Sequence, residues 1–413
     1  MEEKNQYLSK KIIRQLYYAK TFSSSDLSSE INKSLPVTTK ILNELIKEGV
    51  VVETGYAPST GGRRPVMYSI ASDVLFIVAV AMDQFITRIA IMDINNCFVT
   101  PEEKFELPLQ NNAEALTILS EKIENVINKS GIPKSKLAGI GIGMPGFVDV
   151  KKGINYSFLP SGDKSLTEYL YDKVNIPVFI DNDSTIVALA ELKFGAARGK
   201  KNAMVINAGW GVGLGMILSG SLFRGNNGFA GEFSHLSLFN NNKLCSCGKT
   251  GCLETEASLL IVVEKAIEGL KAGRLSKLKQ LQKGRFEEGI EAIITAAHEG
   301  DQFAIELLSD AGYKIGRGIA ILIHLLNPEV VILSGRGSYA GKIWNAPVQQ
   351  AINEHCIPRL SFNTQVEVSS LGYTAELIGA AVLVMENYEK QLQGKSKAIK
   401  RKGRYSIEEK AEV

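Results

Sequence analysis

Four side chains that can bind a transition metal lie close together in this chain. His235 is followed by Cys245, Cys247 and Cys252, so three of the five cysteines in the 413 residues fall within eight positions. Thiolate sulfur and imidazole nitrogen are ligands that tetrahedral Zn²⁺ prefers. All four positions would be filled by side chains, which leaves none for a catalytic water. We therefore predict a structural zinc site.

The alternative is a glycine-rich turn with buried free thiols, because unpaired cysteine often behaves as a small core residue. The neighbours of these cysteines are Asn, Lys, Ser, Gly and Thr, which argues against a core position. Gly248 and Gly251 allow the backbone to fold back and deliver Cys252 to the metal. Glu232 and Glu254 flank the ligands, so a metal that fixes His235 also fixes the direction of these carboxylates.

The spacing of residues 231–254 resembles a family signature. The string Gly-Glu-x-x-His, followed by Cys-x-Cys-Gly-x-x-Gly-Cys-x-Glu, is similar to that of the ROK family of sugar kinases and sugar-responsive repressors. Further similarities run from near residue 10 to near residue 385. The family usually has glycine where this chain has Ser234, a change that leaves the spacing intact. The resemblance implies a zinc-stapled, two-lobed sugar-binding fold.

Composition narrows the class of protein. Hydrophobic residues make up 45% of the chain, enough for sizeable cores, and the length allows two or three domains. The longest apolar runs, such as residues 74–82, are too short to cross a bilayer, and the first residues lack the apolar stretch of a secretory signal. We expect a cytoplasmic protein with no membrane partner, in which Cys97 and Cys356 are ordinary free thiols.

The net charge of +3 is unevenly distributed. Residues 1–70 carry ten Lys/Arg against seven Asp/Glu, and residues 390–413 carry eight against three, so the middle is acidic. Basic ends favour a nucleic-acid partner there, and the acidic middle favours a small-molecule partner. The polar segment 390–413 has no periodicity and is predicted to be disordered.

The first 72 residues predict a small DNA-binding module. Helices are expected over 6–20, from Ser25, and over 37–48, followed by two strands, the second over 66–70. The third helix is sized for a major groove, and a Gly-Gly-Arg-Arg-Pro tip is suited to a minor groove. The candidate DNA contacts are Thr38, Thr39, Lys40 and Asn43 on the outer face of the third helix, with Arg63 and Arg64 at the tip.

A small helical dimerisation module with a solvated basic loop is the alternative for this segment. The combination of three helices, a wing and the arginine tip resembles the N-terminal winged helix-turn-helix of ROK repressors, which the family's kinases lack. We expect an α/β protein with a winged helix-turn-helix over 1–72, a first lobe over 73–195 and a second lobe over 196–389. The resemblance makes the lobes ribonuclease H-like, as in actin-like ATPases, with a ligand cleft between them.

Candidate ligand-binding residues follow a buried strand that ends at residue 180. Asp181-Asn182-Asp183 precedes a predicted helix, and simple helix capping by Asp183 is the alternative role. The resemblance assigns Asn182, Asp183, Glu232, His235 and Glu254 to binding of a hexose-like ring. It also places Asp183 at the position of the kinases' general base. Phe158 stands where many relatives have an asparagine that contacts the sugar, which could change the sugar accepted.

The phosphate-binding motifs of the kinases are degraded in this chain. The first hairpin has Ala81-Met82-Asp83-Gln84-Phe85-Ile86 in place of Asp-x-Gly-Gly-Thr-Lys, and phosphate would meet a carboxylate there. The second loop has Trp210 where a hydroxyl is expected, and the adenine-side glycines include Arg336. Phosphoryl transfer needs the phosphates cradled and their charge neutralised. We therefore expect no enzymatic activity.

The sequence thus predicts a transcriptional repressor that binds operator double-stranded DNA and senses a sugar or sugar phosphate between its lobes. A homodimer or homotetramer is expected, because operator half-sites are read by paired heads. Two alternatives stay open. One is an ATP-dependent sugar kinase with an added DNA-binding head, and the other is a protein whose lobes bind another protein.

Overall fold

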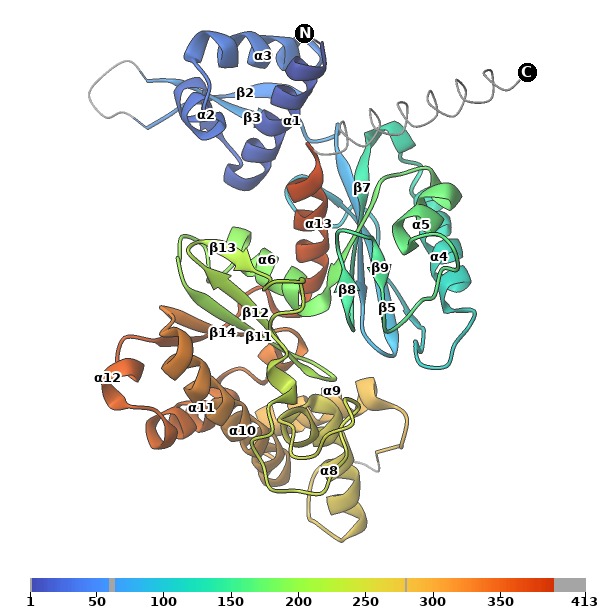
Figure 1. Cartoon of the computed structure of the whole chain (residues 1–413), viewed down its shortest axis with the longest axis vertical. Coiled ribbons are helices and arrows are strands. Elements are labelled where there is room, and N and C mark those ends of the chain that lie inside the picture. Colours follow the sequence, from blue (N-terminus) through green and yellow to red (C-terminus); the bar gives the residue numbers. More distant parts are fainter. Residues whose placement is uncertain (1, 59–63, 279–280, 390–413) are drawn as a thin grey trace, which may run out of the picture.

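Figure 1 shows a computed structural model of the chain, in which residues 2–58, 64–278 and 281–389 are described. A small N-terminal module is followed by two lobes, each built on a five-stranded sheet. Among the described helices, none has both the length and the apolar character needed to cross a membrane. Arg63 and the basic segment 390–413 lie outside these ranges, so the predictions made for them are not examined by the structure.

The N-terminal module combines three helices with a three-stranded antiparallel sheet. Its core is formed by one face of each helix, to which Leu16, Leu27 and Ile41 contribute buried side chains. The strand predicted over residues 66–70 is present as β3. The helices are α1 (Glu2–Ala19), α2 (Ser24–Ile31) and α3 (Leu35–Lys47), and the strands in sheet order are β1 (Phe22–Ser23), β3 (Val66–Ile70) and β2 (Val51–Tyr56).

One prediction for the third helix is wrong. The Thr38 side chain is 0% exposed, and its hydroxyl donates a hydrogen bond to the Ser34 carbonyl at 3.2 Å. Positions 38, 41, 42 and 45 recur at helical spacing and all face the core of the module. Thr39, Lys40 and Asn43 are exposed, as expected.

The first lobe is built on a mixed sheet. Strands β10, β7 and β4 are parallel, and β5 and β6 continue the sheet in antiparallel order, so the hairpin predicted after residue 74 is confirmed. The elements are β4 (Phe76–Met82), β5 (Ile86–Asp93), β6 (Glu103–Glu106), α4 (Ala115–Ser130), β7 (Leu137–Met144), β8 (Val148–Asp149), β9 (Ile154–Asn155), α5 (Leu166–Val174) and β10 (Val178–Asn182).

The second lobe has a five-stranded sheet in the order β13-β12-β11-β14-β15. Helices α8 to α11 supply most of its hydrophobic core, in which Trp344 is among the largest buried side chains. The elements are β11 (Ala203–Ala208), β12 (Val212–Leu218), β13 (Ser221–Phe223), α7 (Glu254–Ala257), α8 (Leu259–Lys271), α9 (Phe286–His298), α10 (Gln302–Leu326), β14 (Val330–Ser334), α11 (Lys342–His355), α12 (Pro358–Ser361) and β15 (Gln365–Val368).

The last helix, α13 (Ala375–Asn387), returns to the first lobe and packs against β4 and β7 (Figure 1). The expected second-lobe boundary of 196–389 is therefore wrong for this helix. Two glycines permit the close approach. A Cβ on Gly141 of β7 would overlap the Ala380 backbone, and one on Gly379 would overlap the backbone of Ile186 in α6 (Asp183–Phe194). Helix α6 also packs against β11 and β12, so it lies between the two sheets.

Candidate functional site

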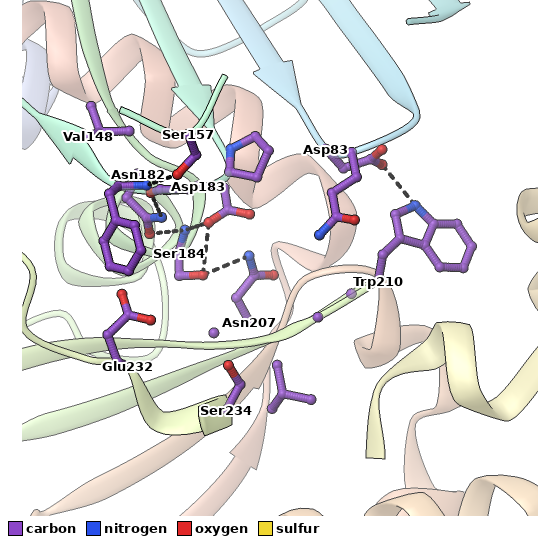
Figure 2. Close-up of a pocket in the computed structure, with 18 of the residues that line it drawn as sticks. Asp83, Val148, Ser157, Asn182, Asp183, Ser184, Asn207, Trp210, Glu232 and Ser234 are labelled. Carbon is purple, nitrogen blue, oxygen red and sulfur yellow. Dashed lines mark hydrogen bonds between the residues drawn. The ribbon is translucent and has the colours of Figure 1, made fainter. Parts of the chain in front are cut away.

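A cleft of about 550 Å³ lies between the two lobes. The first lobe lines it with the N-terminus of α6 and the turn after β7, and the second lobe with the glycine turn after β11 and the segment that leads to the cysteines. Phe158 lines the cleft as well, so a phenyl ring does occupy part of its wall. In Figure 2, Asn182 and Asp183 on one wall face Glu232 on the other.

The N-terminus of α6 holds two of the predicted ligand-binding residues in different roles. Asn182 is the N-cap, because its Oδ1 accepts hydrogen bonds from the amides of Ser184 at 3.0 Å and Thr185 at 3.3 Å. Its side-chain amide donates to the Gly146 carbonyl at 3.3 Å. Asp183 is the first residue of the helix. The capping role considered for Asp183 is therefore filled by Asn182.

The Asp183 carboxyl lies deep in the cleft. It accepts hydrogen bonds from the Ser184 amide at 2.6 Å and from the Ser184 hydroxyl at 3.1 Å. Burial, with the charges of Glu376 and Asp83 nearby, nevertheless raises its pKa to about 7. The side chain can therefore accept hydrogen bonds when ionised and can exchange a proton near neutral pH.

The opposite wall presents Glu232, His235 and Glu254. His235 Nε2 lies 3.6 Å from a Glu232 carboxylate oxygen, and burial raises the pKa of Glu232. The Glu254 carboxylate lies against the glycine turn, because Oε2 would be 2.8 Å from a Cβ placed on Gly211. All five predicted ligand-binding residues therefore line the same cleft.

The four predicted metal ligands are brought together beside the cleft. Their ligand atoms all lie within 4.8 Å of one another, with Cys247 Sγ 3.6 Å from Cys252 Sγ and His235 Nδ1 3.4 Å from Cys245 Sγ. Ligand atoms around a tetrahedral zinc are separated by about 3.8 Å, given Zn–S bonds of about 2.3 Å. The cluster is therefore compatible with structural zinc. His235 would turn Nδ1 to the metal and the other ring nitrogen toward Glu232.

Charged and aromatic side chains from both lobes meet where Asp83, Trp210 and Arg336 line the cleft. The Trp210 indole nitrogen donates to Asp83 Oδ2 at 3.1 Å, and the Arg336 guanidinium lies 3.1 Å from the same oxygen (Figure 2 shows the first contact). Arg336 stacks 4.4 Å from the Trp210 ring centre and also pairs with Glu287. Because Asp83 belongs to the first lobe and the others to the second, we call these four residues the interlobe network.

Two further features could not be read from the sequence motifs. Asn207 of β11 lines the cleft, and its Oδ1 is buried without a hydrogen-bond partner among the described residues, while its Nδ2 donates to the Ser184 hydroxyl at 3.3 Å. Arg224 from the second lobe forms a two-pronged ion pair with buried Asp181 of the first, at 2.9 and 2.6 Å. A lone Asn or Arg carries no motif, so only spatial proximity could have identified either residue.

Comparison with known proteins agrees with the architecture. The sequence model that describes the ROK family matches residues 80–387, about three quarters of the chain. The chain belongs to the ROK family. A glucokinase from Halalkalibacterium halodurans is 33% identical over 71% of this chain and 90% of its own length. A xylose repressor from Caldicellulosiruptor bescii is 29% identical over 91% of this chain and 94% of its own.

A solved structure is similar to this protein over nearly the whole chain. A ROK family transcriptional regulator, described as a homologue of the E. coli MLC protein, superposes with a TM-score of 0.76 at 27% identity, over 95% of this chain and 99% of its own. The repressor and the regulator thus match part of the N-terminal module as well as the lobes, whereas the glucokinase matches 71% of the chain.

Proposed function

We propose that this chain is a sugar-responsive transcriptional repressor. One observation carries the proposal: α6 and α13 each begin at the ligand cleft and end at the N-terminal module. Asp183 at the start of α6 and Glu376 at the start of α13 line the cleft. The opposite ends of the same helices pack against α1, as Figure 1 shows for α13.

The contact between the module and the two helices is extensive. The Tyr18 hydroxyl of α1 donates to Glu386 of α13 at 2.7 Å, and Lys193 of α6 pairs with the same carboxylate at 3.1 Å. The Tyr17 ring packs edge-on against Phe194, with ring centres 5.5 Å apart. Charged groups farther along reinforce the contact, through Arg14 with Glu389 at 3.0 Å and Lys20 with the Ile94 carbonyl at 2.8 Å.

These contacts support a route from the cleft to the module. A ligand that alters how the lobes close shifts the near ends of α6 and α13, and packed helices transmit such displacements as rigid units. The module would then change its orientation relative to its partner in a dimer. The sugar must bind the two states with different affinity, since a ligand of equal affinity shifts nothing.

The N-terminal module supports DNA binding through its exposed side chains. With helices α1 to α3 and the β2–β3 hairpin, it has the elements of a winged helix-turn-helix. Thr39, Lys40 and Asn43 on α3 are free to reach a major groove, and Arg64 is exposed at the base of the hairpin. Arg63 keeps its proposed role as a DNA contact. Thr38 is no longer proposed as a DNA contact, because its side chain is buried. Relatives that match this module are named repressors or transcriptional regulators.

The part of the cleft lined by Asp83, Trp210 and Arg336, which we call the nucleotide half because the resemblance places the kinases' phosphate loops there, argues against a kinase. Asp83 Oδ1 already accepts hydrogen bonds from the amides of Phe85 and Ile86 at 2.8 Å each, and Oδ2 faces Trp210 and Arg336. Phosphates entering here would displace an indole and meet a carboxylate, which is unfavourable for a group that needs its charge neutralised. We assign Asp183 to sugar binding and not to catalysis, and the metal cluster to structural Zn²⁺ that orients His235 and the adjacent carboxylates.

The direct test is binding to double-stranded DNA from the region upstream of the protein's own gene. Fluorescence anisotropy of a labelled fragment, measured from 50 to 200 mM salt, is expected to give a steep decrease of affinity with salt. Lys40→Ala should reduce the slope by about one unit, since one phosphate contact is lost. Lys271→Ala, at the end of α8 in the second lobe, is the matched control and should leave the slope unchanged. Absence of binding to every upstream fragment would refute the proposal.

A further inference from the structure

The ionisable groups of the cleft are almost all acidic. Five carboxylates line it, and of the described lining residues only Arg336 is a Lys or Arg. Proteins that recognise phosphate or carboxylate groups use Arg, Lys or free amides at a helix N-terminus. The question is therefore whether any such group is available to a ligand here. The five carboxylates belong to Asp83, Asp183, Glu232, Glu254 and Glu376.

Arg336 is not available. Its side chain is 6% exposed, and its guanidinium pairs with Asp83 and Glu287 and bonds to the Tyr373 hydroxyl. It is also enclosed between two aromatic rings, with centres 4.4 Å away for Trp210 and 4.5 Å away for Tyr373. The one arginine in the lining thus compensates two acidic groups that are already present. An incoming anion would have to take it from them.

The helix N-terminus is not available either. The first amides of α6 that point into the cleft donate to side chains, Ser184 N to both Asn182 and Asp183, and Thr185 N to Asn182. The glycine turn of the second lobe closes on itself, because the Gly209 amide donates to the Gly211 carbonyl at 2.9 Å. The Ser184, Thr185 and Gly209 amides are therefore already paired with acceptors of the protein itself.

The acidic side chains of the cleft that lack an ion-pair partner are hydrogen-bond acceptors. Asp183, Glu232 and Glu254 have no Lys or Arg partner within ion-pair distance in the described structure. Sugar hydroxyls donate hydrogen bonds without bringing charge, whereas a phosphate ester brings a charge of about −1.5 to −2 at neutral pH.

We infer that the cleft binds an unphosphorylated, uncharged sugar and discriminates against phosphorylated and acidic sugars. This inference rests on the proposed function and narrows it to one class of effector. Burial first, and then the charges of Glu376 and Asp83, raise the pKa of Asp183 to about 7, so this position already disfavours negative charge. A dianion placed beside this group would add repulsion that no described lining cation is free to offset.

The test uses the full chain and matched ligand pairs in one buffer at constant ionic strength. Glucose, mannose and N-acetylglucosamine are each compared with their own 6-phosphate by titration calorimetry, and xylose is included alone. The inference expects at least one free sugar to bind at least about tenfold more tightly than its phosphate. Equal or tighter binding of the phosphate overturns the inference, and if that phosphate also alters DNA binding, the repressor proposal survives.

A variant separates charge from shape. Asp183→Asn removes one charge at nearly constant volume and should lower the ratio of the phosphate to the free-sugar dissociation constant by at least about threefold, even if both affinities fall. Asp163→Asn, an exposed residue that does not line the cleft, should leave the ratio unchanged. An unaltered ratio in Asp183→Asn contradicts the electrostatic explanation. Absence of binding by every ligand, with DNA binding intact, would refute sugar sensing itself.

Discussion

The two halves of the interlobe cleft differ in how their polar groups are satisfied. In the half where we propose that the sugar binds, Asp183 and Glu232 face one another, and neither has a Lys or Arg partner among the described residues. In the nucleotide half, Asp83, Trp210 and Arg336 satisfy one another across the lobes. The comparison shows that one half of the cleft leaves its carboxylates without cationic partners, whereas the other half joins the two lobes through paired side chains.

The largest expected effect concerns the zinc site that we propose beside Glu232 and Glu254. Cys247→Ser should abolish stoichiometric zinc and lower the melting temperature by at least roughly 10 °C, because binding of a structural metal contributes folding free energy. Metal content by mass spectrometry and thermal unfolding provide the measurements. Cys97→Ser, an exposed cysteine far from the cluster in sequence, is the control and should change neither quantity. An unchanged melting temperature in Cys247→Ser would show that the metal cluster does not stabilise the fold.

The next effect concerns the nucleotide half. Arg336→Ala removes the cation shared by Asp83 and Glu287, of which only Glu287 keeps another cationic partner, Lys104. Loss of one partner of a buried pair costs about 3 kcal/mol. The melting temperature should fall by roughly 3–4 °C. Arg285→Ala removes an exposed arginine that pairs with Glu288 and should cost less than about 1 kcal/mol. Equal stability of the two variants would mean that the interlobe network does not hold the lobes together.

The smallest effect lies at the far ends of α6 and α13. Glu386→Gln weakens the contacts with Tyr18 and Lys193, so sugar and DNA should still bind but influence one another less. The factor by which sugar changes operator affinity should fall by roughly threefold to tenfold. Glu354→Gln on α11, which bonds to Tyr313, is the control. A full coupling factor in Glu386→Gln would point to a route that bypasses this junction.

Local patterns predicted much of the fold and the metal cluster. Short stretches of sequence were enough to predict the β4–β5 hairpin, the strand from Val66 and the grouping of His235 with the cysteines. Thr38 shows the limit of such patterns, because a polar residue at a core-facing helical position can bond to its own backbone and be buried.

Other features depend on residues far apart in the chain. Asp83, Trp210 and Arg336 are separated by more than a hundred positions each, so no local rule could indicate that they meet. Gly141 and Gly379 allow α13 to pack closely in the first lobe, but a glycine in the sequence does not indicate which segment will approach it. Tertiary contacts of this kind become visible only once both sheets are placed.

The central claim is that occupancy of the cleft changes the affinity of the N-terminal module for DNA. The most direct test measures the dissociation constant for an upstream DNA fragment by fluorescence anisotropy, without sugar and with a saturating sugar whose binding is established by calorimetry. The account predicts that saturating sugar raises this constant at least about tenfold, equivalent to a coupling free energy of about 1.4 kcal/mol. An identical constant in both conditions, with the cleft occupied, would contradict it.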